Sequence, residues 1–259
     1  MERLRNMRAF ICDMDGVIYH GTKILPGAQE FVSWLKSQQK EYLFLTNSSE
    51  KTTAELSTKL ATMGLDVHED HFYTCALSTA DFLHQQSPQA SVFVIGGRGI
   101  IQALENINFK ITDTNPDFVV VGDTRDYDFA LIEKATNFVA NGARLIGTNP
   151  DLSVPTEKGI APHTGSIIAP IEMATGKKAY FLGKPNPLMM RNAVKRLSSP
   201  VAESVIIGDR MDTDIIAGLE SGLLTVLVLS GVCQRKDVPQ YPFRPDYIIS
   251  GVGEIPRIT

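Results

Sequence analysis

The sequence predicts an α/β fold in which a doubly wound parallel sheet is interrupted by an inserted α/β domain. Three observations lead to this prediction. Short apolar runs recur along the chain, and helical patterns alternate with them. The runs are apolar throughout rather than at every second residue, as in strands that are buried on both faces of a parallel sheet. The segment from about Ser91 to Phe181 carries its own alternation of strands and helices, and each flank resembles half of a doubly wound domain.

The apolar runs predict the strands of both domains. Each run is bounded by residues that favour turns, which fixes its approximate ends. In chain order the predicted strands are Ala9–Cys12, Tyr42–Leu45, Val92–Ile95, Phe118–Val121, Arg144–Ile146, Val205–Ile207 and Leu224–Leu229.

The helices predicted between these strands have recognisable ends. Pro26 suits the first turn of a helix, because its fixed φ is already helical. Thr52 and Glu55 have the spacing of a capping box, and Gly64 is the residue type that ends a helix. Two further helices are predicted at Asp128–Asn141 and Pro187–Leu197.

Composition excludes several classes of partner. The 259 residues include 29 acidic and 25 basic side chains, a formal net charge of −4. This charge argues against a nucleic acid polymer or an anionic membrane surface, although a few local groups can still hold a small anion. The three cysteines form no CxxC pair, and no apolar run reaches the ~18 residues of a membrane-spanning helix. We therefore expect a soluble, cytoplasmic protein.

Carboxylates gather where two of the predicted strands end. Asp13 and Asp15 follow the first strand, and Asp209, Asp212 and Asp214 follow the strand that ends at residue 207. In open α/β sheets, ligands bind outside the carboxyl ends of the strands. Asp and Gly are also common in ordinary turns, so the first pair alone does not decide between a turn and a site. Three carboxylates after one strand exceed what a helix start needs, and a hard cation such as Mg²⁺ accounts for the surplus.

Two further segments carry polar groups at such positions. Thr46 and Asn47 follow the second strand and precede a helix, where hydroxyl and N–H groups can cradle a phosphate or simply cap the helix. Lys184 precedes Pro185, which favours an extended chain and a fixed place for the ammonium group. A lysine beside prolines is more often a solvated loop residue. Lys184 is therefore a candidate site residue only in combination with the other strand-end segments.

A glycine-rich turn, Gly96–Gly99, follows a strand and precedes a helix. This position invites a dinucleotide-binding interpretation. The third glycine of that fingerprint is replaced by Gln102, so a tight turn within the insert is the favoured interpretation.

Taken together and in chain order, four segments resemble the haloacid dehalogenase superfamily of phosphohydrolases, and more closely its NagD-type branch. They are Asp13-Met14-Asp15-Gly16-Val17, Leu45-Thr46-Asn47-Ser48, Gly183-Lys184-Pro185 and Gly208-Asp209-Arg210-Met211-Asp212-Thr213-Asp214. Residues 115–122 and 148–151 are similar to the cap of that branch. The resemblance covers essentially the whole chain. It implies a Rossmann-like catalytic core at 1–82 and 183–259 and an inserted α/β cap of the C2 type at 83–182, which selects the substrate.

The resemblance also implies catalytic roles. Asp13 is the expected nucleophile, which forms an aspartyl-phosphate and splits the hydrolysis into two steps. Asp15 is the expected general acid and base, which protonates the leaving oxygen and then takes a proton from water. Thr46 and Asn47 are expected to bind the phosphoryl oxygens, and Lys184 to neutralise charge on nucleophile and phosphate.

The expected cofactor is Mg²⁺, with Mn²⁺ or Co²⁺ as substitutes. By the same resemblance its ligands are Asp13, the backbone carbonyl of Asp15, and Asp209, with Asp214 in support. Asp212 is equally compatible with a helix start and with a substrate contact.

Residues that choose the leaving group are expected in the cap and beside the metal site. A loop at Gly147–Thr164 is predicted to present Asn149, Asp151 and His163, although solvation is the default for loop residues. Arg210 is a further candidate of this kind.

We therefore expect a phosphomonoester hydrolase of small metabolites, foremost nucleoside 5′-monophosphates such as UMP or GMP. Phosphoglycolate, pyridoxal phosphate and sugar phosphates are the alternative substrates. A phosphoacceptor signalling module and a non-catalytic binding relative are the competing classes. The chain exceeds the length of a phosphoacceptor module, and the set of Asp13, Asp15, Thr46, Lys184 and Asp209 argues against lost activity. A monomer or small homo-oligomer is expected.

Overall fold

The chain folds as two compact units. The structure, a computed structural model, describes residues 2–156 and 159–257. The core unit comprises the described parts of 1–46, 57–73 and 184–259, and the inserted unit comprises those of 47–56 and 74–183. The sequence-based division at 82/83 and 182/183 remains a prediction; the compact units change over at Tyr73/Thr74 and Gly183/Lys184, and residues 47–56 belong to the inserted unit.

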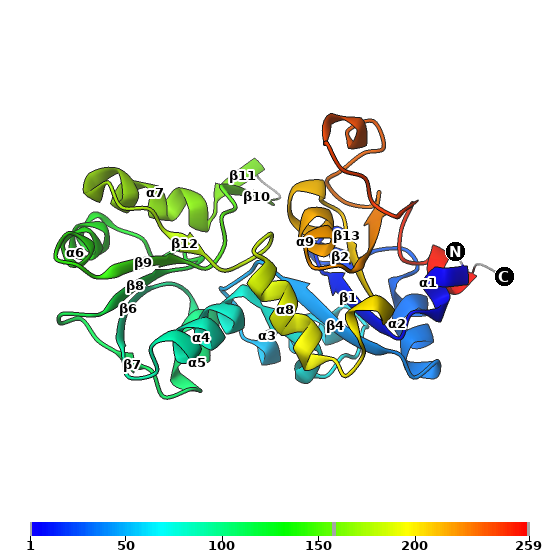
Figure 1. Ribbon diagram of the computed structural model, residues 1–259, viewed down its shortest axis with the longest axis horizontal. Coiled ribbons are helices and arrows are strands. Elements are labelled where there is room, and N and C mark those ends of the chain that lie inside the picture. The colour runs from blue at the N-terminus through cyan, green and yellow to red at the C-terminus, as the bar shows by residue number, and fades with distance from the viewer. Residues whose placement is uncertain (1, 157–158, 258–259) are drawn as a thin grey trace. The chain divides into compact units, whose positions relative to one another are not determined.

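A six-stranded sheet forms the centre of the core unit, in the order β15–β14–β13–β1–β4–β5. Figure 1 labels its strands β13, β1 and β4. The pairs from β15 through to β4 are parallel. The chain leaves β1 toward β4 and leaves β13 toward β14, so the strand order reverses between β1 and β13. That point is where doubly wound sheets bind ligands. The strands are β1 (Ala9–Asp13), β4 (Glu41–Thr46), β5 (Phe72–Thr74), β13 (Ser204–Gly208), β14 (Leu224–Val228) and β15 (Tyr247–Ile249).

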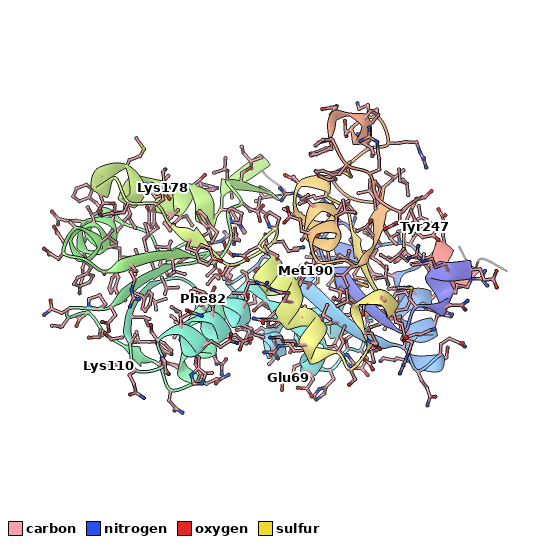
Figure 2. The ribbon with its side chains drawn as sticks, in the orientation of Figure 1. Glu69, Phe82, Lys110, Lys178, Met190 and Tyr247 are labelled. Carbon is pink, nitrogen blue, oxygen red and sulfur yellow. The ribbon has the colours of Figure 1, made fainter. Side chains whose placement is uncertain are left out.

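Helices and a short hairpin complete the core unit. The hairpin pairs β2 (Tyr19–His20) with β3 (Lys23–Ile24) directly after the loop that follows β1. The helices are α1 (Glu2–Asn6), α2 (Ala28–Ser37), α3 (Thr53–Thr62), α8 (Pro187–Arg196), α9 (Ile216–Glu220) and α10 (Glu254–Arg257), with short helical turns η1 (Glu69–His71), η2 (Val201–Glu203), η3 (Met211–Ile215) and η4 (Val238–Gln240). Met190 of α8, labelled in Figure 2, is fully buried.

The predicted helix ends are confirmed at several positions. The Thr52 hydroxyl accepts the N–H of Glu55, and the Glu55 carboxylate accepts the N–H of Thr52, which completes the capping box of α3. Gly64 follows α3 with φ of 86°, a conformation that costs glycine little. Asp128 caps α6 (Phe129–Ala140) by accepting the N–H of Leu131.

The inserted unit has its own parallel sheet of five strands, in the order β12–β9–β8–β6–β7. Its apolar core joins β8 residues such as Val119 and Val121 to Ile168 of α7. The elements are α4 (Cys75–Gln86), β6 (Ser91–Ile95), α5 (Arg98–Glu105), β7 (Lys110–Ile111), β8 (Phe118–Val121), α6, β9 (Arg144–Gly147), β10 (Ser153–Thr156), β11 (Gly159–Pro162), α7 (Thr164–Thr175) and β12 (Tyr180–Phe181).

The segment predicted as a loop at Gly147–Thr164 is in part an antiparallel hairpin, which corrects the prediction. Strands β10 and β11 pair with each other from Ser153↔Pro162 to Thr156↔Gly159. Leu152, just before the hairpin, is 68% exposed and Ile160 within it is 81% exposed, so the segment buries little apolar surface and lacks the continuous apolar pattern of the sheet strands.

None of the helices within the described ranges combines the length and the apolar character that a bilayer crossing requires.

Aromatic packing anchors β1 to α2. The ring of Phe10, which is fully buried, lies edge-on to Trp34 at 5.4 Å and to Phe31 at 6.1 Å between ring centroids. Such edge-to-face pairs add to the free energy gained by burying the rings themselves.

We predict that Phe10→Ala lowers the free energy of unfolding by about 3–5 kcal/mol, because it leaves a cavity between β1 and α2. Urea denaturation followed by circular dichroism measures the change. The matched control is Phe129→Ala on α6, whose side chain is 77% exposed and whose loss is expected to cost no more than about 0.5 kcal/mol. Equal losses from both variants would contradict the packing described here.

Candidate active site

The predicted site residues Asp13 and Lys184 meet at the carboxyl end of β1. Asp13 is the last residue of β1, and Lys184 is the first residue of the core unit after the insert. The Lys184 ammonium group lies 2.7 Å from Oδ1 of Asp13 and 2.7 Å from Oδ1 of Asp214. The side chains of Lys184 and Asp214 are 3% and 0% exposed. Contact between their opposite charges therefore has to replace the hydration that both lose on burial.

Asp214 reaches the site because the chain after β13 turns through the π-helical segment η3. Its Oδ2 accepts the N–H of Arg210 at 3.1 Å. A Cβ at Gly208 would lie 2.1 Å from the Cβ of Asp214, so only glycine fits at the end of β13. π-Helical turns are often found at functional sites, where they re-aim a side chain.

Asp209 lies directly after β13, on the strand that neighbours β1. Its Oδ2 accepts the N–H of Val232 at 2.7 Å. Gly16 and Gly231 pack so close that a Cβ on either would lie within 2.4 Å of that same oxygen. Gly16 also has φ of 77°, a second reason for glycine at this position. Glycine at position 16 therefore allows both the left-handed turn after β1 and the close approach of the Asp209 carboxylate.

The three carboxylates form a cluster that can hold a metal ion. One oxygen from each of Asp13, Asp209 and Asp214 lies within 4.8 Å of the other two. Carboxylate oxygens are the ligands that Mg²⁺ prefers, and a buried group of three acids beside one lysine has more negative than positive charge to balance. The donor set thus fits a hard divalent cation.

Burial and mutual repulsion change the protonation of the cluster. Burial raises the pKa of Asp13 to about 8; Lys184 opposes this, while Asp214 and Asp209 reinforce it. Burial and the charge of Asp214 raise the pKa of Asp209 to about 6. Burial alone would lower the pKa of Lys184, but Asp13 and Asp214 raise it on balance, so the lysine stays charged. A divalent cation bound by the cluster would reverse the pKa shifts of the acids, because it would favour their ionised forms.

Two other predicted residues, Thr46 and Asp15, lie at or just after the carboxyl ends of β4 and β1. Strand pairing sets Asp13 beside Leu45, so Thr46, the last residue of β4, follows at the carboxyl end of the neighbouring strand. Asp15 lies two residues beyond β1, with Oδ1 3.3 Å from Nδ1 of His20 on the β2–β3 hairpin. Both of these side chains are more than half exposed, so Asp15 can meet a solvent-borne group.

Arg210 pairs with its own neighbour. Its Nε and Nη2 bind the two carboxylate oxygens of Asp212 at 3.0 and 2.8 Å. This bidentate pair accounts for the third acid of the motif, Asp212, which the carboxylate cluster does not include.

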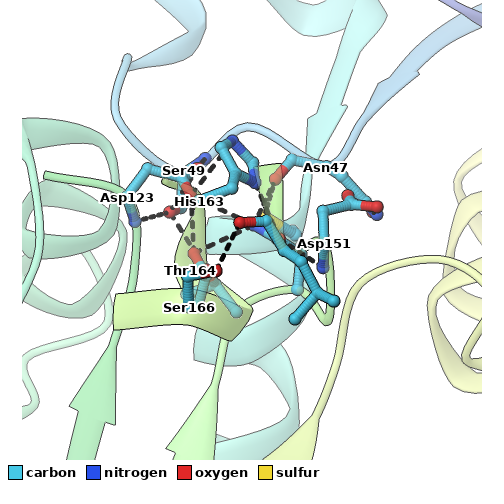
Figure 3. Close-up of polar contacts among 11 residues, drawn as sticks. Asn47, Ser49, Asp123, Asp151, His163, Thr164 and Ser166 are labelled. Carbon is cyan, nitrogen blue, oxygen red and sulfur yellow. Dashed lines mark hydrogen bonds and ion pairs between the residues drawn. The ribbon is translucent and has the colours of Figure 1, made fainter. Parts of the chain in front are cut away.

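Asn47, Asp151 and His163 come together within the inserted unit (Figure 3). Asn149 belongs to the same group, because it contacts all three of them. The Asn47 amide donates to Asp151 at 2.8 Å, and Nδ1 of His163 lies 3.0 Å from Oδ1 of Asn149. Asn149, Asp151 and His163 were predicted together on one segment and Asn47 as a phosphate ligand, but their shared network was not foreseen.

The same network contains residues that the sequence analysis missed. Asp123 lies two residues after β8, only 7% exposed, and binds Ser49 and Thr164. The rule that polar groups at strand ends form sites could have identified Asp123. Nothing local in the sequence indicates that Ser49 is its partner, since 74 residues separate them.

Comparisons with known proteins identify the family of the chain. A family model described as haloacid dehalogenase-like hydrolase matches residues 10–110, and a second model of that hydrolase class matches residues 181–255. The two matches include the ends of β1 and β13. The chain belongs to the haloacid dehalogenase-like hydrolases.

Its similarity to NagD places the chain among the NagD-type phosphatases, which hydrolyse phosphoric monoesters. It is 43% identical to ribonucleotide monophosphatase NagD of Escherichia coli K12, over 95% of this chain and 96% of that protein. The solved NagD structure superposes with a TM-score of 0.91 and covers 96% of this chain and 98% of its own. Dihydroxyacetone phosphatase of Corynebacterium glutamicum is also 43% identical, over 95% and 90% of the two chains. 5′-Nucleotidase YutF of Bacillus subtilis is 36% identical, over 98% and 100%.

We predict that the stabilisation of this NagD-type phosphatase by Mg²⁺ increases with pH between about 6 and 8. Asp13 and Asp209 have raised pKa values in the folded, metal-free protein, so folding retains protons that the unfolded chain releases. Stability of the metal-free protein therefore falls as pH rises through this window, and cation binding offsets the loss. The measurement is the melting temperature in EDTA and in excess Mg²⁺ at each pH.

Asp13→Asn provides the control, because it replaces the acid whose pKa is raised to about 8 with an amide of the same shape. The Mg²⁺-induced rise in melting temperature is expected to be smaller in this variant and to depend less on pH. A rise that stays constant from pH 6 to 8 in the unaltered protein would contradict the assignment of the cluster as the cation site.

Proposed function

We propose that this NagD-type phosphatase is a Mg²⁺-dependent hydrolase that acts through an aspartyl-phosphate on Asp13. Its substrates are small phosphorylated metabolites, foremost nucleoside 5′-monophosphates such as UMP and GMP. The observation that carries the proposal is the buried cluster of Asp13, Asp209 and Asp214 against Lys184, at the point where the strand order reverses. The names of the relatives NagD and YutF favour nucleotides.

Asp13 and Lys184 carry the first step. Lys184 holds Oδ1 of Asp13 at 2.7 Å, which orients the carboxylate and leaves Oδ2 as the attacking atom. The attack forms a bond between Oδ2 and phosphorus and breaks the bond to the leaving oxygen. The ammonium group also offsets the negative charge of the phosphoryl group as nucleophile and phosphate approach.

Asp15 handles the protons. It gives a proton to the leaving oxygen in the first step and takes one from the water that cleaves the aspartyl-phosphate in the second. Its exposure and its contact with His20 support this role, since a group that serves substrate and water in turn must be reachable by both. Thr46 and Asn47 bind the phosphoryl oxygens.

Asp13, Asp209 and the backbone carbonyl of Asp15 would hold the cation, with Asp214 in support. Bound there, Mg²⁺ supplies positive charge that stabilises the phosphoryl group during transfer. Mn²⁺ or Co²⁺ can bind to the same oxygen donors.

The proposed specificity residues are Asn149, Asp151, His163 and Arg210.

We place the protein in the cytoplasm, as a monomer or small homo-oligomer. The free state of the buried Cys12, Cys75 and Cys233 supports a reducing compartment.

A second candidate is a phosphatase of a short sugar phosphate. The 43% identity to dihydroxyacetone phosphatase equals that to NagD and favours this alternative over phosphoglycolate or pyridoxal phosphate.

We predict that Asp13→Asn lowers kcat for every phosphomonoester by at least about 10³-fold, because the amide cannot act as nucleophile. Phosphate release in excess Mg²⁺ measures turnover, and circular dichroism checks that the fold persists. Asp70→Asn is the matched control, since Asp70 is an exposed acid of η1 outside the cluster and its variant is expected to keep full activity. A folded Asp13→Asn protein with most of its activity would disprove the nucleophile assignment.

We predict that kcat/KM for UMP and GMP exceeds that for dihydroxyacetone phosphate, phosphoglycolate and pyridoxal phosphate by about tenfold, the free energy of roughly one additional hydrogen bond. Phosphate release at substrate concentrations below KM gives the ratio directly. A preference for dihydroxyacetone phosphate would select the second candidate, and release from none of these substrates would reject phosphatase activity on this panel.

A further inference from the structure

Asp123 is a buried carboxylate that the proposed mechanism does not use. Its Oδ2 accepts the N–H of Ser49 at 2.8 Å and the Ser49 hydroxyl at 3.0 Å (Figure 3). Its Oδ1 accepts the Thr164 hydroxyl at 2.5 Å and lies 3.2 Å from Nε2 of His163. Asn149 Nδ2 approaches Oδ1 at 3.3 Å. An amide in place of this carboxylate would turn its NH₂ group toward donors, so the network requires the acid.

The network holds both ends of the segment Asn47–Ser49. The carbonyl oxygen of Asn47 accepts Asn149 Nδ2 at 2.8 Å and the thiol of Cys75 at 2.8 Å. Two residues later, the N–H of Ser49 is bound to Asp123. The orientation of the Asn149 amide is fixed, because its Oδ1 accepts the N–H of Asp151 while its Nδ2 donates.

The glycine-rich turn Gly96–Gly99 holds the residues that follow. Gly99 donates its N–H to the carbonyl oxygen of Glu50 at 2.9 Å, and Ile100 donates to that of Ser49 at 3.0 Å. A Cβ at Gly99 would lie 2.5 Å from the carbonyl oxygens of Ser49 and Lys51. The glycines of this turn therefore allow close backbone packing, and its first N–H groups bind the chain itself rather than a nucleotide.

We propose that Asp123 is a positioning residue for the phosphate-binding turn Thr46–Asn47. It acts through Ser49, which follows Thr46 by three residues along the chain, and so fixes the backbone of Asn47–Ser49. This inference rests on the proposed function, in which Thr46 and Asn47 bind the phosphoryl oxygens. A residue that acts there affects the phosphoryl group, which all substrates share, rather than the leaving group.

The chain offers a matched control for the motif. Ser91 donates its N–H and hydroxyl to one carboxylate oxygen of Asp117 at 2.8 and 2.9 Å, and its Oγ accepts the N–H of Asp117. Ser49 and Asp123 repeat all three bonds. Both pairs lie in the inserted unit, but Ser91 and Asp117 lie at the starts of β6 and β8, at the opposite end of the strands from Asp123.

The experiment compares Asp123→Asn and Ser49→Ala with Asp117→Asn and Ser91→Ala. Ser49→Ala keeps the backbone bond to Asp123, so it reports on the network even if Asp123→Asn fails to fold. Three quantities are measured below each variant's melting temperature: kcat/KM for UMP, kcat/KM for p-nitrophenyl phosphate, and the dissociation constant of inorganic phosphate by calorimetry in excess Mg²⁺.

Asp123→Asn is expected to lower both kcat/KM values by a similar factor of about 10- to 100-fold, the cost of a small misplacement of reacting groups. It should weaken phosphate binding as well, and Ser49→Ala should do the same to a smaller extent. The two controls should leave all three quantities within about twofold, although they lower the melting temperature.

Unchanged kinetics and phosphate affinity in both network variants would overturn the inference. A loss confined to one substrate would also overturn it, since it would place the effect on the leaving group. Failure of the proposed function has a different signature, namely no phosphate release by the unaltered protein. Phosphate affinity then still decides the inference: an Asp123-dependent affinity supports it, and no measurable binding overturns it.

Discussion

A buried ammonium group between two carboxylates is the interaction on which the core unit depends. Removing Lys184, Asp13 and Asp214 from water carries a large desolvation cost, which only close mutual contact offsets. The strand end at Asp13 and the π-helical turn at Asp214 must therefore converge on one atom. Lys184 is also the first core residue after the insert, so the same contact fixes where the chain returns to its sheet.

The electrostatic arrangement explains why a protein of net charge −4 suits an anionic substrate. The acids of the site lie so close together that burial and mutual repulsion raise the pKa values of Asp13 and Asp209. A divalent cation bound there would, together with the charged Lys184, change the sign of the local field. Net charge describes the whole surface, whereas a small ligand meets only the groups within a few ångströms of it.

Much of this architecture could be predicted from sequence because its signals are local. Strands such as β8 are continuously apolar, and Asp13 and Asp209 directly follow such runs, so strand-end reasoning located the cluster. Several strands of two to four residues, β10 and β11 among them, escaped prediction, because a segment that is short and not continuously apolar shows no clear period. The Ser49–Asp123 pair escaped for another reason: it is defined by a contact across 74 residues, and neither residue is unusual in its own neighbourhood.

The β10–β11 hairpin has one more consequence. A two-stranded ribbon has two open edges, each a template on which another chain could add a strand. Here Pro155 lies in β10 and Pro162 in β11, and proline has no N–H to donate to an incoming strand. Leu152 before the hairpin and Ile160 in β11 are exposed, so an incoming strand would find apolar side chains to pack against. The missing N–H groups of the prolines weaken the backbone pairing that such a strand would need. The hairpin can present apolar side chains to solvent while its backbone discourages the intermolecular β-pairing that leads to aggregation.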